Sequence, residues 1–177
     1  EAMIFSAMEQ YTALWDEEFH GGLPVLFTVF NNFYGMGGQT SGETMPPQIT
    51  VKAGAAIGAE QMHAEQVDGY NPLAVIDAVQ RKKEQIIQKK GPALLDILTY
   101  RTTGHSASDA GSYRTEEEIE RWRQADSIVS FGNRLKENHI AGAAELEEIN
   151  RQSAELADKV CALAADDNIS PRIFTGA

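Results

Sequence analysis

Two short runs of apolar residues differ from the rest of the chain, where apolar residues recur at helical spacing. PVLFTVF at 24–30 and ALLDILTY at 93–100 are rich in β-branched and aromatic residues, and each follows a Gly- or Pro-containing break. Continuous apolar runs of this length are typical of strands that are buried on both faces of a sheet. We therefore predict two buried strands at these positions.

Helical spacing is visible before and between these strands. Residues 1–19 place apolar side chains at intervals of three and four, which predicts one amphipathic helix. ITVKAGAAIGAEQ at 49–61 favours a helix of small residues, and HAEQVDGYN at 63–71 favours a short strand that ends in a turn. The glycine-rich residues 35–47 are expected to form a loop.

A further helix has clear signals at both ends. Asn71 stands before Pro72, which is the usual pairing of an N-cap with the first helical residue. Lys89-Lys90-Gly91 predicts the end of this helix, with cations at the negative end of the helix dipole and then a glycine. Its expected apolar face consists of Leu73, Ile76, Val79 and Ile86 or Ile87.

The order strand, helix, strand predicts an α/β fold with a parallel sheet flanked by helices. Ligands of such sheets bind at the carboxyl ends of the strands. Two loops leave those ends, NNFYGMGG at 31–38 and RTTGHSASDAGSY at 101–113. We expect these two loops to meet and to form the functional site.

Residues 115–177 are expected to be a helical tail that follows a first domain over 1–114. Thr115 followed by Glu118 predicts a capping box, in which each side chain bonds the backbone N–H of the other residue. The last helix carries a seam at alternating steps of three and four, made by Leu146, Ile149, Ser153, Leu156, Val160 and Leu163. We expect this seam to pack on its own domain, with another subunit as the alternative.

The composition restricts the ligands. The chain has 15 Lys and Arg against 26 Asp and Glu, which gives a formal charge of −11 at pH 7. This charge argues against a nucleic-acid groove and an anionic membrane surface, and no apolar run approaches the roughly 20 residues of a membrane span. The single cysteine, Cys161, fits a reducing compartment and is expected to be a small core residue rather than a reactive thiol.

Two asparagines follow the first strand, although asparagine is depleted in strands. The side-chain oxygen of Asn32 and the main-chain carbonyl of Tyr34 would make two neutral ligands of an octahedral Mg²⁺, which also takes a carboxylate and phosphate oxygens. The alternative is that Asn31 and Asn32 only turn the chain. Spacing alone leaves both interpretations open.

His105 lies between a glycine and hydroxyl residues at the end of the second strand. A histidine there would donate to a diphosphate or stabilise charge during a reaction, and the alternative is a solvated loop residue.

Two other signals are weak. GMGG lacks the Lys-Ser/Thr that follows a phosphate-binding loop, and Asp68-Gly69 favours a turn over a metal carboxylate.

Taken in order, three segments resemble one family. LPVLFTVFNNFYGMGG, VDGYNPLAV and GPALLDILTYRTTGHSASDAGSYRTEEEIERW are similar in sequence and order to the α subunit of thiamine-diphosphate-dependent 2-oxo acid dehydrogenases, especially the pyruvate type. The similarity runs from about residue 1 to residue 135. It implies that residues 1–114 are the C-terminal half of a thiamine-diphosphate-binding α/β domain.

The resemblance implies roles for five residues. Asn32 and Tyr34 would hold Mg²⁺ and through it thiamine diphosphate, and His105 would be a catalytic and cofactor-binding residue beside the diphosphate. Ser106 and Ser112 fall where some members are phosphorylated. A phosphate there would repel the cofactor diphosphate, and ordinary loop hydroxyls are the alternative.

The family's Gly-Asp-Gly motif, which supplies the metal carboxylate, does not precede Asn32 here, and the chain opens at EAM in the middle of a helical pattern. We therefore expect a fragment, a split subunit or part of a fused polypeptide, with the missing N-terminal half as one partner. The resemblance implies as further partners a β subunit or β-type region, a lipoyl acyltransferase component and a small 2-oxo acid. It implies a location in the bacterial cytoplasm or the mitochondrial matrix.

The implied function is that of the decarboxylating component of a 2-oxo acid dehydrogenase complex. This component carries out oxidative decarboxylation of a 2-oxo acid, here with a preference for pyruvate, and transfers the acyl group to a lipoyl group. Two alternatives remain, a non-catalytic half-domain that acts as an assembly or regulatory partner and a flavodoxin-like nucleotide binder. The 177 residues alone are expected to be inactive.

Overall fold

The computed structural model describes residues 23–40, 42–46, 48–57 and 62–171. The chain divides into two compact units, with the boundary between Ser127 and Ile128. The first unit carries the sheet and the candidate site, and the second is helical in its described part. The helix predicted for residues 1–19 lies outside the described residues.

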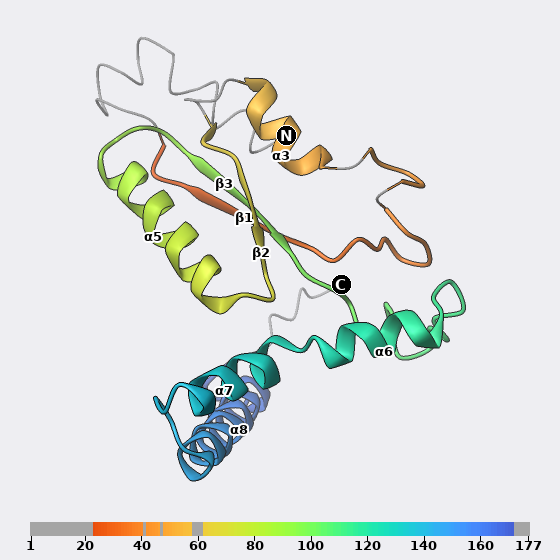
Figure 1. Cartoon of the computed structure of the whole chain (residues 1–177), viewed down its shortest axis with the longest axis vertical. Coiled ribbons are helices and arrows are strands. Elements are labelled where there is room, and N and C mark those ends of the chain that lie inside the picture. The colour runs from red at the N-terminus through yellow and green to blue at the C-terminus, as the bar shows by residue number, and fades with distance from the viewer. Residues whose placement is uncertain (1–22, 41, 47, 58–61, 172–177) are drawn as a thin grey trace. The chain divides into compact units, whose positions relative to one another are not determined.

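Three parallel strands form the sheet of the first unit, in the order β1–β3–β2 (Figure 1). They are β1 (Leu26–Asn31), β2 (Glu65–Asp68) and β3 (Ala93–Leu98). Leu98, the last residue of the central strand, is paired with Asn31 on one side and with Asp68 on the other. All three strands therefore end at the same edge, and the predicted α/β fold with a parallel sheet is confirmed.

The two long strands differ in burial. β3 is buried on both faces, as predicted, and its residues Ala93 to Ile97 are all buried. β1 lies at the edge of the described sheet, and its Phe30 side chain is 70% exposed. The prediction that both strands are buried on both faces is therefore wrong for β1, because an apolar run does not reveal whether its strand is central or at an edge.

Two helices cover opposite faces of the sheet (Figure 1). α5 (Pro72–Ile87) covers the face that presents Val67, Leu95 and Ile97, and its Ala78 is fully buried against them. α3 (Ile49–Ile57) covers the other face, where Gly54 lies against Met62, Ala64 and Leu94. The predicted flanking helices are thus confirmed.

α5 begins as predicted, but its end and its buried face match the prediction only in part. Asn71 Oδ1 accepts a hydrogen bond from the Ala74 N–H at 3.3 Å, whereas the helix ends at Ile87 and the left-handed residue after the Gln88 C-cap is Lys89, with a φ of +59°, rather than a glycine. The side chains that contact the sheet are Ala74, Val75, Ala78 and Val79, whereas Leu73 and Ile76 are exposed. Val79 of the expected face is confirmed, and Leu73 and Ile76 were wrong, because small residues such as Ala74 and Ala78 let the helix approach the sheet closely.

The Asp68-Gly69 turn closes β2 against the end of β3. The Tyr70 N–H donates to Asp68 Oδ1 at 2.9 Å, and the Gly69 N–H donates to the Leu98 carbonyl at 2.9 Å. A Cβ on residue 69 would lie 2.3 Å from that same carbonyl oxygen. The turn interpretation is confirmed, and the close approach of the two chains requires glycine.

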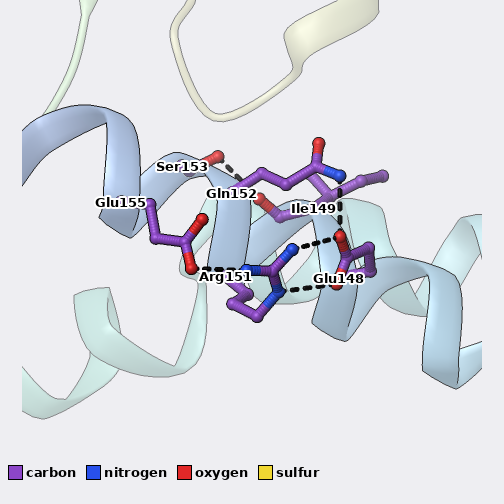
Figure 2. A network of polar contacts seen from close by, with 6 residues as sticks. All are labelled: Glu148, Ile149, Arg151, Gln152, Ser153 and Glu155. Carbon is purple, nitrogen blue, oxygen red and sulfur yellow. Dashed lines mark hydrogen bonds and ion pairs between the residues drawn. The ribbon is translucent and has the colours of Figure 1, made fainter. Parts of the chain in front are cut away.

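The second unit contains α7 (Ser127–Glu137) and α8 (Ala143–Ala165), which lie side by side with Gly132 facing Leu146. Figure 2 shows how Arg151 of α8 lies between Glu148 and Glu155, with its Nη2 2.6 Å from Glu148 Oε1. These side chains are exposed, so screening by water leaves each pair with little effect on helix stability.

The apolar seam of α8 has no cover within the described residues of its own unit. Ile149, Leu156 and Val160 of the seam are exposed, and Cys161 is exposed rather than part of a core, so the expectation for Cys161 is wrong and the partner of the seam stays a prediction. α8 has no buried residue at all. The periodicity identified the helix, but it carried no information about what covers the apolar stripe.

Among the described helices, none is long and apolar enough to cross a membrane.

Replacing Gly69 with Ala is expected to lower the free energy of unfolding by about 1–3 kcal/mol, because the added Cβ overpacks against the Leu98 carbonyl. Chemical denaturation measures the change. Gly37→Ala is the control, since a Cβ there meets nothing within 4 Å, and it should change stability by less than about 0.5 kcal/mol. Equal stability of the two variants would contradict the close packing of this turn.

Candidate functional site

The candidate site lies at the edge where β1 and β3 end together. The Thr99 N–H donates to the Asn31 carbonyl at 2.8 Å, so the two chains leave the sheet side by side. Arg101 then reaches across, and its Nη2 donates to the Met36 carbonyl at 3.2 Å. The prediction that the two loops meet is confirmed.

The two asparagines turn the chain at the end of β1. Asn31 Oδ1 accepts from the Phe33 N–H at 3.3 Å, and Asn32 Oδ1 accepts from the Tyr34 N–H at 3.0 Å. Phe33, which follows the two asparagines, has a φ of +65°, a backbone conformation that residues other than glycine rarely adopt. The turn role is therefore present in the structure, and the metal role of Asn32 stays a prediction.

The main-chain carbonyl of Tyr34 points away from the small hairpin that follows. The Thr40 N–H donates to the Phe33 carbonyl at 2.7 Å, and the Gly35 N–H donates to the Gly38 carbonyl at 2.9 Å. Because C=O and N–H point in opposite directions in a trans peptide, the second bond turns the Tyr34 carbonyl outward. The hairpin bonds therefore leave this oxygen for another partner, and Asn32 Oδ1 keeps a second lone pair.

The Tyr34 ring lies inside a cluster of aromatic rings and cations. Its centroid is 5.8 Å from that of Tyr100, edge to face, and 5.7 Å from that of Tyr113. The guanidinium groups of Arg101 and Arg114 lie 5.8 and 5.4 Å from the same centroid, within the range of a cation–π attraction. Arg114 is only 9% exposed. The two arginines, which follow β3, therefore hold the Tyr34 ring of the loop that follows β1.

Main-chain carbonyls beyond β3 accept hydrogen bonds from the buried arginine, whose Nε has no partner among the described residues. Arg114 donates to the Arg101 carbonyl and, through Nη2, to the Thr103 carbonyl at 2.9 Å. Arg101 Nη2 also donates to the Tyr113 hydroxyl at 2.6 Å. The segment between the two arginines is thus closed at its base by side-chain bonds.

α6 (Glu116–Gln124) contributes a carboxylate to this cluster. Thr115 caps the helix, since its Oγ1 accepts from the Glu118 N–H at 3.2 Å, so half of the predicted capping box is confirmed. Glu118 Oε1 instead accepts from the hydroxyls of Tyr34 and of Tyr100, the latter at 2.9 Å. Burial, and then the bond to Glu118, raise the pKa of the Tyr34 hydroxyl above its usual range.

Asp109 holds the loop that carries His105. Its Oδ2 accepts from the His105 N–H and from the Tyr113 hydroxyl, both at 2.7 Å, and its Oδ1 accepts from the Gly111 N–H at 2.8 Å. These bonds, the one from the His105 backbone first, lower the pKa of Asp109 from 3.8 to about 2. A Cβ on Gly104 would lie 2.6 Å from the Asp109 carbonyl, so glycine is required where the loop closes.

The three predicted site residues occupy the two loops as expected, but they are not equally connected. Asn32 and Tyr34 lie in the first loop, and among the described residues the hydrogen bond that joins this loop to the second runs through Arg101. His105 is held through its main chain, and its side chain is exposed. Ser106 and Ser112 are also exposed, and a regulatory role for them stays a prediction.

A small cavity opens at the same edge of the sheet, on the side of α3. It has a volume of about 150 Å³ and is lined by Asn31, Phe33, Thr40, Gln48, Gln66 and Leu98 among others. Pockets that hold drug-sized ligands measure about 300–1,000 Å³, so this space is too small for a large cofactor. The described residues contain no cluster of three or more His, Cys, Asp or Glu that would hold a metal alone.

Most residues of the cluster were missed by sequence reasoning. The sequence does contain a signal, because Tyr100-Arg101 and Tyr113-Arg114 repeat the same dipeptide at a distance of 13 residues, on either side of the His105 loop. Such a pair places two rings and two cations at the base of one loop. Asp109 and Glu118 carry no comparable signal, since both stand among ordinary surface residue types.

Known proteins resemble this chain over nearly its whole length. The family model described as "Dehydrogenase E1 component" matches residues 20–171. The chain belongs to this family. The assignment confirms the resemblance to 2-oxo acid dehydrogenases, and it argues against a flavodoxin-like nucleotide binder.

Several relatives are α subunits of pyruvate dehydrogenase by name. A Caenorhabditis elegans protein, a probable mitochondrial pyruvate dehydrogenase E1 component subunit alpha, is 34% identical over 97% of this chain and 40% of its own length. The subunit alpha of Rickettsia bellii is 32% identical over 88% of this chain and 44% of its own length. The human testis-specific mitochondrial form is 34% identical over 88% and 37%. This chain thus spans about two-fifths of these relatives.

Replacing Asp109 with Asn is expected to speed hydrogen exchange at the His105 and Gly111 amides by about tenfold or more, because bonds to a charged acceptor are the stronger ones. Exchange followed by NMR or mass spectrometry measures the effect. Asp77→Asn, which removes an exposed carboxylate from α5, should leave both amides unchanged.

The same carboxylate predicts a dependence on pH. The pKa of Asp109 is lower in the folded protein than the ordinary 3.8. Its contribution to the stability of the folded protein is therefore complete above about pH 4 and is lost as the pH falls through about 2. An Asp109 carboxyl that titrates near its ordinary pKa in an NMR titration would contradict the three hydrogen bonds.

Proposed function

We propose that this chain is part of the decarboxylating component of a 2-oxo acid dehydrogenase complex, with pyruvate as the preferred substrate. The observation that carries the proposal is the meeting of two loops at the carboxyl ends of β1 and β3. One loop presents the oxygens of Asn32 and Tyr34, the other presents His105, and Arg101 bonds across. The family match and the names of the relatives support it.

Asn32 Oδ1 and the Tyr34 carbonyl fit two positions of an octahedral Mg²⁺ site, since both are neutral oxygens with lone pairs outside the hairpin bonds. Mg²⁺ also favours a carboxylate, and we place that ligand on the N-terminal portion that the longer relatives have. Thiamine diphosphate, when bound, supplies the carbanion chemistry that removes carbon dioxide from a 2-oxo acid. The metal would neutralise much of the diphosphate charge, which a chain of charge −11 otherwise repels.

His105 suits a role in donating to the diphosphate or in moving a proton near the reacting carbon. Asp109 fixes the backbone at residue 105, so the position of the imidazole does not depend on bonds made by the imidazole itself.

Partner chains would supply the rest of the cofactor site and the acceptor of the acyl group. The cavity of about 150 Å³ is too small for the cofactor, which favours a site shared with a β subunit or β-type region. The acyl group would then pass to a lipoyl group on an acyltransferase component. Because the relatives include mitochondrial and bacterial proteins, we propose the mitochondrial matrix or the bacterial cytoplasm as the location.

A non-catalytic half-domain that serves assembly or regulation is the second candidate. The observation in its favour is that the described residues contain no acidic cluster beside Asn32 and Tyr34. The two functions differ in one measurable property. A catalytic part supports magnesium-dependent binding of thiamine diphosphate once its partners are added, and a purely structural part does not.

Asn32→Ala is expected to raise the magnesium concentration needed for thiamine diphosphate binding by at least about tenfold in the complete assembly, because one direct ligand is lost. Calorimetry at a series of magnesium concentrations measures this. Asn31→Ala is the matched control, since it removes a similar turn bond to the Phe33 N–H without removing a proposed ligand. An unchanged requirement in Asn32→Ala would remove Asn32 from the metal site.

His105→Ala is expected to reduce acylation of a lipoyl domain by about 10²-fold or more while stability changes by less than about 0.5 kcal/mol. The reason is that the loop is anchored by the main-chain N–H of residue 105, which alanine retains. Lipoyl acylation and denaturant unfolding are measured on the same preparation. A loss of stability that accounts for the lost acylation would show a structural role instead.

A further inference from the structure

Glu118 connects α6 to the proposed metal ligand through the Tyr34 side chain. Its Oε1 accepts hydrogen bonds from two tyrosine hydroxyls, of which one belongs to Tyr34 after β1 and the other to Tyr100 after β3. One carboxylate oxygen on a third element thus holds the chain just beyond both strands. Neither bond is needed for the helix itself, because Thr115 already caps it.

The Tyr34 ring has little freedom once this bond is made. The rings of Tyr100 and Tyr113 lie within 5.8 Å of its centroid, and Arg114 lies at 5.4 Å. Trp122, also on α6, stacks on Tyr100 at 4.9 Å and fixes the second donor. The ring of Tyr34 is therefore held at its sides by an edge-to-face ring, a tilted ring and a guanidinium, and at its tip by Glu118.

The peptide that carries the Tyr34 carbonyl needs such support. It is followed by Gly35, and a glycine tolerates either orientation of the preceding peptide at low cost. The bond from the Gly35 N–H to the Gly38 carbonyl, at 2.9 Å, belongs to this same peptide and holds its outward orientation from the loop side. A Tyr34 ring that can move would let this peptide rotate and turn its oxygen away from a metal.

We propose that Glu118 is a positioning residue, which keeps the Tyr34 carbonyl directed at the metal by holding the hydroxyls of Tyr34 and Tyr100. The inference rests on the proposed function, since it concerns the same metal site. It assigns to α6 a role in metal affinity, although no atom of α6 serves as a ligand. Loss of an outer partner of this kind commonly weakens metal binding by about 10–100-fold.

The test uses the complete assembly and Mn²⁺ as the probe, with free Mn²⁺ measured by electron paramagnetic resonance in the presence of thiamine diphosphate. Glu118→Ala should raise the Mn²⁺ dissociation constant by about tenfold or more. Glu118→Gln should stay within about threefold of the unchanged protein, because the amide oxygen still accepts both bonds. Glu117→Gln removes an exposed charge from the same turn and is the matched control.

Tyr34→Phe keeps the ring and removes only the hydroxyl, so it tests the link even if Glu118→Ala fails to fold. We expect a rise in the Mn²⁺ dissociation constant of about three- to tenfold, with unfolding of the metal-free protein nearly unchanged. Saturating Mn²⁺ should restore cofactor binding in every variant, which a general structural defect would not allow.

Unchanged Mn²⁺ affinity in Tyr34→Phe and Glu118→Ala would overturn the inference, as would a loss that Glu118→Gln shares in full. The proposed function fails on a different result, an unchanged metal requirement in Asn32→Ala. Weak metal binding in Asn32→Ala together with normal binding in the Glu118 and Tyr34 variants would reject only the positioning role.

Discussion

The parallel pairing of β3 with both of its neighbours determines where the chemistry of this chain can lie. In this register Leu98 is opposite Asn31, so the two long strands leave the sheet at the same level. The chain after each strand then has a tyrosine within a few residues, and the rings of Tyr34 and Tyr100 meet edge to face. A shift of one residue would move each side chain to the other face of the sheet and separate these rings. The candidate site is thus a direct consequence of strand register.

Much of the framework could be predicted from sequence because local signals determine it. The strands followed from apolar runs, and the start of α5 followed from Asn71. The meeting of the two loops followed from the rule that ligand sites lie at the carboxyl edge of parallel strands. These features depend on residues close in the chain, or on a topology with few alternatives.

The errors share a different physical origin. Phe30, Leu73 and Cys161 were expected to be buried and are exposed. Burial depends on which element lies opposite, and no local pattern reports that. Glu118 shows the same limit in the site, because a local capping motif predicted its backbone partner while its carboxylate bonds two tyrosines far away in the chain. Side-chain partners across long sequence distances are decided by the assembled fold.

The charge of the site argues for a ligand set built largely from neutral groups. The chain as a whole carries −11, yet the base of the two loops holds Arg101 and Arg114, whose partners are carbonyl oxygens, a tyrosine hydroxyl and ring faces. The carboxylates of Asp109 and Glu118 lie in the same cluster, so the base of the two loops holds two cations and two anions and is less negative than the chain as a whole. The oxygens of Asn32 and Tyr34, which we propose as metal ligands, are neutral and add no negative charge to this edge. In the proposed site an anionic cofactor would therefore meet two arginines that offset the nearby carboxylates, provided that the aromatic cluster keeps both arginines in place.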